Sequence, residues 1–214
     1  MALIFQQRGV TLIEQLVALG LGAVMMTGLF GYFRSEVLHL RTLETRTTTM
    51  EDARGALDIM IRDLKNAGSW GTGSAPAETA SADDPDGDAD TICNRVYLAT
   101  ANSLHVQMDL NGNDNCADLD PRENIRYELT GPTASCPGAT IIRRNGDCLV
   151  ANVVAGPAVL FSYFDGAGND LGSAPARAAI RRVRIAFAVQ VKNPDQRVGG
   201  MLTSLLSSSV EFRN

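Results

Sequence analysis

Asparagine and aspartate residues in the stretch 109–120 are spaced as in a cation-binding loop. Oxygen ligands occupy positions 1, 3, 5 and 12 of these twelve residues: Asp109, Asn111, Asn113 and Asp120. A hard cation such as calcium prefers an oxygen cage of this kind. However, position 6, which is glycine in an EF-hand, is Asp114 here. A calcium site and a polar hairpin loop rich in Asn, Asp and Gly are therefore both open interpretations.

A single carboxylate, Glu14, lies near the start of a long apolar segment. Residues 10–33 contain no other charged side chain, and the segment exceeds the roughly 20 residues that span a bilayer as a helix. An ionised carboxylate at the centre of such a span costs roughly 2.5 to 3.5 kcal/mol, so it normally has a partner. Because the segment contains no Lys, Arg or His, the sequence predicts that the partner of Glu14 comes from outside its own helix.

The four cysteines all follow this apolar segment, which predicts two disulfides formed in an oxidising compartment. Three connectivities are possible. Cys136 and Cys148 flank a hairpin turn expected at residues 145–146, which favours their pairing and leaves Cys93 for Cys116. The strand register decides between these alternatives.

No pattern in the sequence predicts a catalytic centre. None of the common motifs for a nucleophilic serine, a zinc protease or a phosphate-binding loop occurs, and His39 and His105 fit ordinary surface or core positions. The net charge of -5 disfavours nucleic acid as a partner. We therefore expect a protein that is not an enzyme and requires no cofactor, with calcium as the one open ligand.

One long helix and a series of strands must position these residues. No proline occurs before Pro76, so a helix can run from about residue 11 to residue 67 and end at Gly68. Its first half is apolar on all sides, whereas its second half carries an apolar stripe with a seven-residue repeat: Leu43, Met50, Leu57 and Leu64. The stripe predicts that the second half packs on a core.

The strands are predicted from short segments rich in Val, Ile, Tyr and Phe, separated by turns. These segments are residues 95–99, 103–110, 124–130, 140–144, 148–154, 158–165, 179–191 and 207–212. We expect them to form an antiparallel sheet that packs on the second half of the helix, which is an α+β fold.

Gly9 followed by the sequence VTLIEQLVA resembles the prepilin N-terminal motif of type IV pilins and secretion pseudopilins. In that family, glycine precedes the cleavage site and glutamate is the fifth mature residue; Val10 replaces the usual phenylalanine. The resemblance implies that a prepilin peptidase removes residues 1–9 and methylates the new N-terminus. It also implies that the helix forms the packing core of a filament, in which Glu14 can meet the terminal amino group of the next subunit.

The stretch GLGAVMMTGLFGYFRSE and the final strands are similar to those of PilW-type minor pilins. This resemblance implies a type IV pilin-like fold with four parts. They are a leader at residues 1–9, a transmembrane or filament-core helix at 10–33, an amphipathic half of that helix at 34–68, and a β-rich periplasmic head at 69–214.

The sequence thus predicts a PilW-like minor type IV pilin that takes part in pilus assembly or priming. It would be made as a single-pass inner-membrane prepilin with a periplasmic head, and would mature into the pilus fibre at the cell surface. Its partners would be the prepilin peptidase and other pilins that pack through their helices. A type II secretion pseudopilin is the first alternative. A membrane-anchored periplasmic metal-binding module or hydrolase, with an uncleaved N-terminus, is the second.

Overall fold

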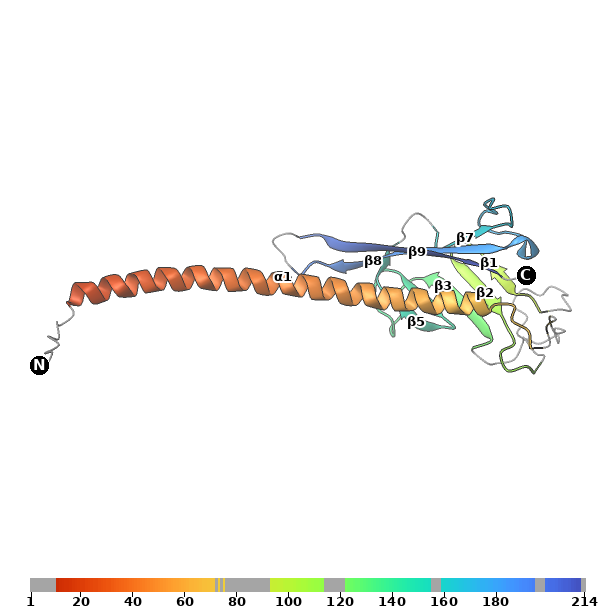
Figure 1. Cartoon of the computed structure of the whole chain (residues 1–214), viewed down its shortest axis with the longest axis horizontal. Helices are drawn as coiled ribbons and strands as arrows, with labels where there is room; N and C mark the ends of the chain where they lie inside the picture. The colour runs from red at the N-terminus through yellow and green to blue at the C-terminus, as the bar shows by residue number, and fades with distance from the viewer. Residues whose placement is uncertain are drawn as a thin grey trace, which may run out of the picture. The chain divides into compact units, whose positions relative to one another are not determined.

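A long helix forms the N-terminal part of the computed structural model, which describes residues 11–71, 73, 75, 93–113, 122–154, 159–194 and 199–212. Helix α1 spans Leu12–Asn66 (Figure 1). Thr11 caps its start, because the Thr11 Oγ1 accepts a hydrogen bond from the Glu14 N–H over 3.4 Å. The helix ends just before Gly68, whose φ of 74° is left-handed. The predicted helix is therefore confirmed to within one residue at each end.

The chain divides into two units. The first contains α1 up to Thr45 together with residues 193–199. The second, which we call the head, contains residues 46–192 and 200–214, and thus the second part of α1 and every strand of the described residues.

The strands of the head form two antiparallel sheets. The first sheet has the order β1-β2-β3-β4-β5, with strands Val96–Ala99, Ser103–Gln107, Asn124–Thr130, Ile141–Arg144 and Asp147–Val150. The second sheet contains β6 (Val153–Val154), β7 (Phe161–Phe164), β8 (Arg182–Lys192) and β9 (Met201–Glu211). Strand β8 pairs with β6 and β7 on one side and with β9 on the other. A 3-10 turn, η1, spans Arg177–Ala179 before β8.

The two-sheet arrangement differs from the single sheet that the sequence predicted, and Asn152 marks one division between the sheets. This residue has a φ of 55°, a left-handed conformation that interrupts an extended strand. The segment 148–154 therefore splits into β5 in one sheet and β6 in the other. The last strand also begins earlier than predicted, because β9 pairs with β8 along its full length, from Met201 opposite Lys192.

The core of the head lies between α1 and the two sheets. Ala53, Met60 and Leu64 on α1 are almost fully buried, as are Tyr127 on β3 and Phe187 on β8. Of the apolar stripe predicted for the second half of the helix, Leu57 and Leu64 thus face the core, whereas Leu43 is exposed and Met50 is only partly buried. Outside the head, the helix residues at positions 12–33 are all exposed.

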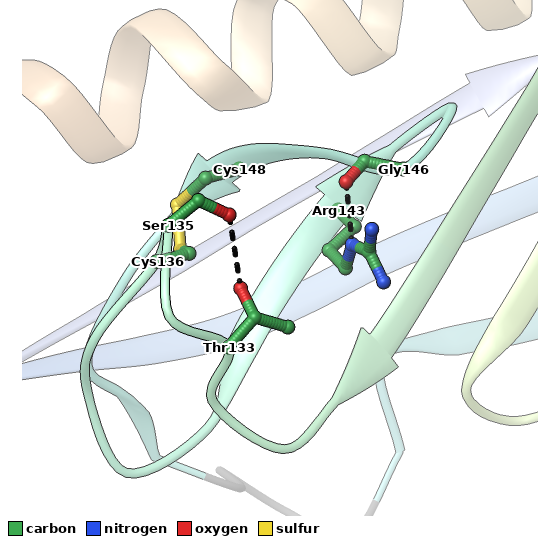
Figure 2. The surroundings of a disulfide bond; sticks show 6 residues. All are labelled: Thr133, Ser135, Cys136, Arg143, Gly146 and Cys148. Carbon is green, nitrogen blue, oxygen red and sulfur yellow. Dashed lines mark hydrogen bonds between the residues drawn. A yellow bond between two sulfur atoms is a disulfide. The ribbon is translucent and has the colours of Figure 1, made fainter.

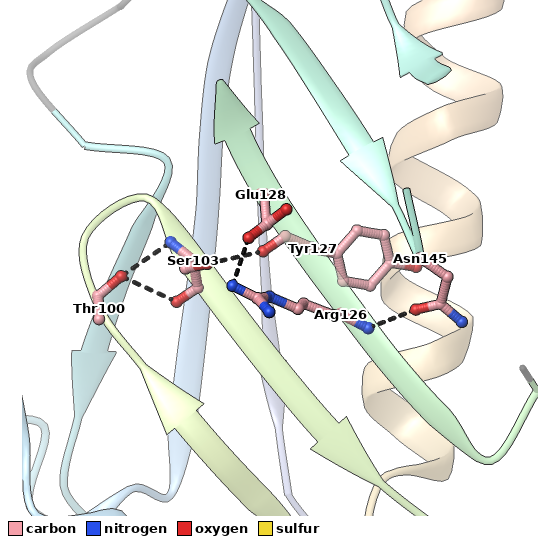
Figure 3. A network of polar contacts seen from close by, with 6 residues as sticks. All are labelled: Thr100, Ser103, Arg126, Tyr127, Glu128 and Asn145. Carbon is pink, nitrogen blue, oxygen red and sulfur yellow. Dashed lines mark hydrogen bonds and ion pairs between the residues drawn. The ribbon is translucent and has the colours of Figure 1, made fainter. Parts of the chain in front are cut away.

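Asn145 fixes the hairpin between β4 and β5 onto the neighbouring strand β3. Asn145 and Gly146 have φ angles of 48° and 89°. Both are left-handed, as a two-residue type I′ hairpin turn requires. The Asn145 Oδ1 accepts the Arg126 N–H over 2.7 Å (Figure 3). Ser103 and Thr100 close the neighbouring β1–β2 turn in the same view, through a 2.9 Å hydrogen bond from the Ser103 N–H to the Thr100 Oγ1.

Candidate functional site

The N-terminal part of α1 presents an apolar surface on all of its sides. Within residues 12–33 the only charged side chain is Glu14, and the large apolar side chains there are each more than half exposed. By length and composition this helix can cross a membrane, and none of its most apolar 18-residue window is buried. Such a surface requires either lipid or the apolar side chains of other helices around it.

Four glycines make this surface suited to close helix packing. They are Gly20, Gly22, Gly28 and Gly31, and a Cβ atom added at any of them would have no heavy atom of this chain within 4 Å. Small residues of this kind let the backbones of neighbouring helices approach closely in a membrane.

Glu14 occupies a position in the first helical turn that the sequence analysis did not consider. Thr11 and Glu14 have the spacing of a capping box, in which Thr at the N-cap bonds to the N–H three residues later. A carboxylate in the first helical turn is also favoured by the helix dipole. The Ser/Thr-x-x-Glu pattern in the sequence could have indicated this role. Glu14 therefore has two candidate functions, one within its helix and one toward another subunit.

The cleavage site predicted between Gly9 and Val10 lies outside the described residues. A comparison with known families covers this region, because residues 4–30 match a family model described as the prokaryotic N-terminal methylation motif. The chain carries the prepilin-type methylation motif of the type IV pilin and pseudopilin superfamily. No curated protein and no solved structure matches the chain significantly. The chain therefore combines this motif with a fold in which a long N-terminal helix packs on antiparallel sheets.

In this pilin-like head, the side chains of Asp109 and Asn111 hold together the described part of the loop predicted to bind calcium. The Asp109 Oδ1 accepts the N–H groups of Gly112 and Asn113, over 2.7 and 3.2 Å. The Asn111 Oδ1 accepts the Asn113 N–H over 2.9 Å. Asp120 lies outside the described residues, and among the described ones no three His, Cys, Asp or Glu side chains form a metal-binding group. Calcium binding therefore stays a prediction.

Glu123 organises the same loop, which the sequence analysis did not foresee. Its Oε1 accepts the N–H groups of Leu110 and Asn111, over 2.8 and 2.7 Å, and its Oε2 accepts the Asn111 side-chain amide over 3.0 Å. The Glu123 residue is 1% exposed. The buried Glu123 carboxylate thus ties the segment after β2 to the segment before β3 by accepting these hydrogen bonds.

One disulfide of the pilin-like head joins Cys136 to Cys148, whose Cα atoms are 5.6 Å apart (Figure 2). It fastens the segment before β4 to strand β5. Next to it, the Arg143 Nε donates a hydrogen bond to the Gly146 carbonyl over 2.6 Å and supports the hairpin turn. Cys93 is also disulfide-bonded. Its predicted partner, Cys116, lies outside the described residues, so that pairing stays a prediction.

The two histidines of the pilin-like chain take different places in the structure. His39 is exposed on α1. His105 on β2 is 6% exposed; its ring contacts the Tyr97 ring edge-on with centroids 5.0 Å apart, and it hydrogen-bonds to the Asn124 side chain. His105 therefore contributes to packing inside the first sheet.

Proposed function

We propose that this protein is a minor type IV pilin of the PilW type that takes part in pilus assembly or priming. A prepilin peptidase removes residues 1–9, and the mature helix inserts among the helices of other pilins in a filament. The head, held by its disulfide, faces the filament surface. The match of residues 4–30 to the methylation motif is the single observation that carries the processing step of this proposal, whereas the PilW type rests on the resemblance of the sequence that follows the motif.

The exposed apolar surface of residues 12–33 supports a role in assembly. A helix that is apolar all round is stable only in lipid or among other helices. In the inner membrane it anchors the prepilin, and in the filament the same surface packs on neighbouring subunits. The passage from one environment to the other leaves the apolar area buried, so little hydrophobic free energy opposes it.

Glu14 selects the register of this packing. Cleavage after Gly9 creates a terminal amino group on Val10, which carries a positive charge below a pKa near 8. In a medium of low dielectric constant, an unpaired carboxylate is unfavourable, so a subunit is stable in the filament only where Glu14 meets such an amino group. Thr11 caps the start of the helix, and this cap holds the helix start in position for the contact.

The experiment that tests this role compares Glu14→Gln with Glu14→Ala. Glutamine serves as well as glutamate in a capping box but has no charge. We expect both variants to be absent from sheared filaments while their amounts in the membrane stay normal. Formation of the Cys136–Cys148 disulfide, measured by the mobility of each variant on non-reducing gels, checks that the head is folded. If Glu14→Gln enters filaments and Glu14→Ala does not, the Glu14 side chain is needed only for capping and its charge is not needed, so our account of its partner fails.

Cleavage is tested separately by the intact mass of the protein from cells with and without the prepilin peptidase. We expect the mature protein to lack residues 1–9 and to carry one added methyl group. An uncut chain in both strains would contradict the proposal and favour an anchored periplasmic module.

A type II secretion pseudopilin is the second candidate, because the matched motif is a general N-terminal methylation motif and is not specific to pili. The two candidates differ in the process that fails when the gene is deleted. Loss of surface filaments supports the minor pilin, whereas loss of protein secretion with normal filaments supports the pseudopilin.

A further inference from the structure

Three arginines line one small pocket of the head, beside the start of β1. The pocket has a volume of about 210 Å³, and its lining includes Trp70, Asn94, Arg95, Arg177, Ile180 and Arg181. No carboxylate is among its described lining residues. Asp165 and Glu211 line a neighbouring pocket, which shares Arg181 with this one.

Arg95 is held in this pocket without a hydrogen-bond acceptor for its buried Nε, among the residues that the structure describes. Its guanidinium lies over the ring of Phe212, with 5.4 Å from the Arg95 Cζ to the ring centroid. The Arg95 side chain also lies close to Gly68, where an added Cβ would be 2.5 Å from the Arg95 Nε. These contacts fix the position of the guanidinium, and its Nε–H remains an unused donor in a buried place, which is a rare and unfavourable arrangement.

The other two arginines are anchored through the backbone. The Arg181 Nη1 donates to the Ala178 carbonyl over 3.0 Å. The Arg177 Nη1 donates to the Tyr97 carbonyl over 3.2 Å, and its guanidinium lies 5.8 Å from the Tyr97 ring centroid. Burial and the positive charge of Arg181 both lower the pKa of Arg95. The pocket thus brings like charges together, at an electrostatic cost that a bound anion would remove.

We propose that this pocket binds a doubly charged tetrahedral oxyanion, namely a phosphate or sulfate group, through Arg95, Arg177 and Arg181. Guanidinium groups match such oxygens with paired, charge-assisted hydrogen bonds. A group with two negative charges offsets more of the repulsion among three arginines than a single carboxylate does. The pocket volume admits a group of this size but not a large ligand. This inference adds a ligand of the head to the proposed role of the helix in assembly.

The test is a calorimetric titration of the full mature chain, in a non-ionic detergent, with inorganic phosphate at constant ionic strength. We expect saturable binding of one phosphate per chain. Arg181→Gln removes one guanidinium at an exposed position, so it should weaken binding about tenfold or more without unfolding the head. Arg184→Gln is the matched control, because Arg184 is exposed on β8 and does not line the pocket. It should change the affinity by less than about twofold.

Two further titrations define the ligand. Sulfate replaces phosphate in the first, and the tighter of the two anions identifies the group that the pocket prefers. Acetate replaces it in the second, and should bind at least about tenfold more weakly because it carries one charge. Arg95→Lys keeps the charge but loses the planar guanidinium with its paired donors, and should reduce affinity for the preferred anion. Absence of saturable binding by both phosphate and sulfate overturns the proposal, as does an equal loss of affinity in Arg181→Gln and Arg184→Gln.

Discussion

The Arg144 Nε on β4 donates a hydrogen bond to the Asp63 Oδ2 on α1 over 2.8 Å. The hydroxyl of Tyr127 on β3 donates to the same oxygen. Asp63 is 9% exposed and occupies a position in the helix face that otherwise carries Met60 and Leu64. One carboxylate therefore joins the helix to two strands of the first sheet within the head.

Replacement of Asp63 by asparagine should destabilise the head by about 2 to 3 kcal/mol. The change leaves the Arg144 guanidinium partly buried without its counter-charge, and breaking such a pair typically costs several kcal/mol. We expect a loss at the low end of the range for buried ion pairs because the Arg144 side chain is 26% exposed and is partly screened by solvent. Urea unfolding of the full chain, followed by the fluorescence of the single tryptophan, Trp70, measures it. Asp58→Asn, at an exposed position of α1, is the control and should change stability by less than about 0.5 kcal/mol.

The long helix could be predicted from the sequence because its signals are local. An uninterrupted apolar run, a seven-residue repeat and the absence of proline depend only on neighbouring residues, and Gly68 marks the end. The turn at Asn145 and Gly146 was predicted for the same reason: the dipeptide itself selects the turn geometry.

The division into two sheets could not be predicted, because it depends on which strands pair across long sequence separations. Asn152 is surrounded by strand-forming residues in the segment 148–154, and its left-handed backbone becomes evident only from the structure. Similarly, Asp63 reads as a polar residue beside an apolar stripe. Its role depends on Arg144, which is 81 residues away in the sequence.

The stability of the head should fall steeply above about pH 10. Burial, followed by the nearby charge of Asp63, raises the pKa of Tyr127. Burial likewise raises the pKa of Tyr163, whose hydroxyl donates to the Thr100 carbonyl over 2.6 Å. Both groups stay protonated in the folded head, whereas in the unfolded chain they lose their protons near pH 10. The contribution of the two tyrosines to the free energy of unfolding is therefore fully present below about pH 10. Above that pH the free energy of unfolding falls by up to about 1.4 kcal/mol per pH unit for each tyrosine.

Unfolding measured between about pH 9 and pH 11 tests this dependence, with tyrosinate absorbance recorded in parallel. Tyr163→Phe should lower stability by about 1 kcal/mol at neutral pH through the lost hydrogen bond. It should also reduce the slope above pH 10, because one buried tyrosine no longer titrates on unfolding. An unchanged slope in this variant, or tyrosinate formation before unfolding, would contradict the assignment.

Glu123→Ala should destabilise the head by about 2 to 3 kcal/mol, because it leaves the N–H groups of Leu110 and Asn111 without their acceptor. Glu123→Gln keeps an oxygen at the same place and should cost less. Glu128→Ala is the control, because Glu128 on β3 forms an ion pair with Arg126 in which both side chains are partly exposed; it should cost less than about 1 kcal/mol. Equal losses in Glu123→Ala and Glu128→Ala would show that Glu123 does not hold the loop.

Gly138 allows the segment that carries Cys136 to pass close to the backbone between β5 and β6. A Cβ atom at this position would lie 2.9 Å from the Asn152 backbone nitrogen, a distance that real Cβ atoms essentially never show, and 3.0 Å from the Asn152 Oδ1. Gly138→Ala should therefore cost about 1 to 3 kcal/mol, since one of the two segments must shift. Gly131→Ala is the matched control, because an added Cβ there meets nothing within 4 Å. Urea unfolding under non-reducing conditions compares the two variants, and a loss in Gly131→Ala as large as that in Gly138→Ala would mean that the close approach to Asn152 is not what requires glycine.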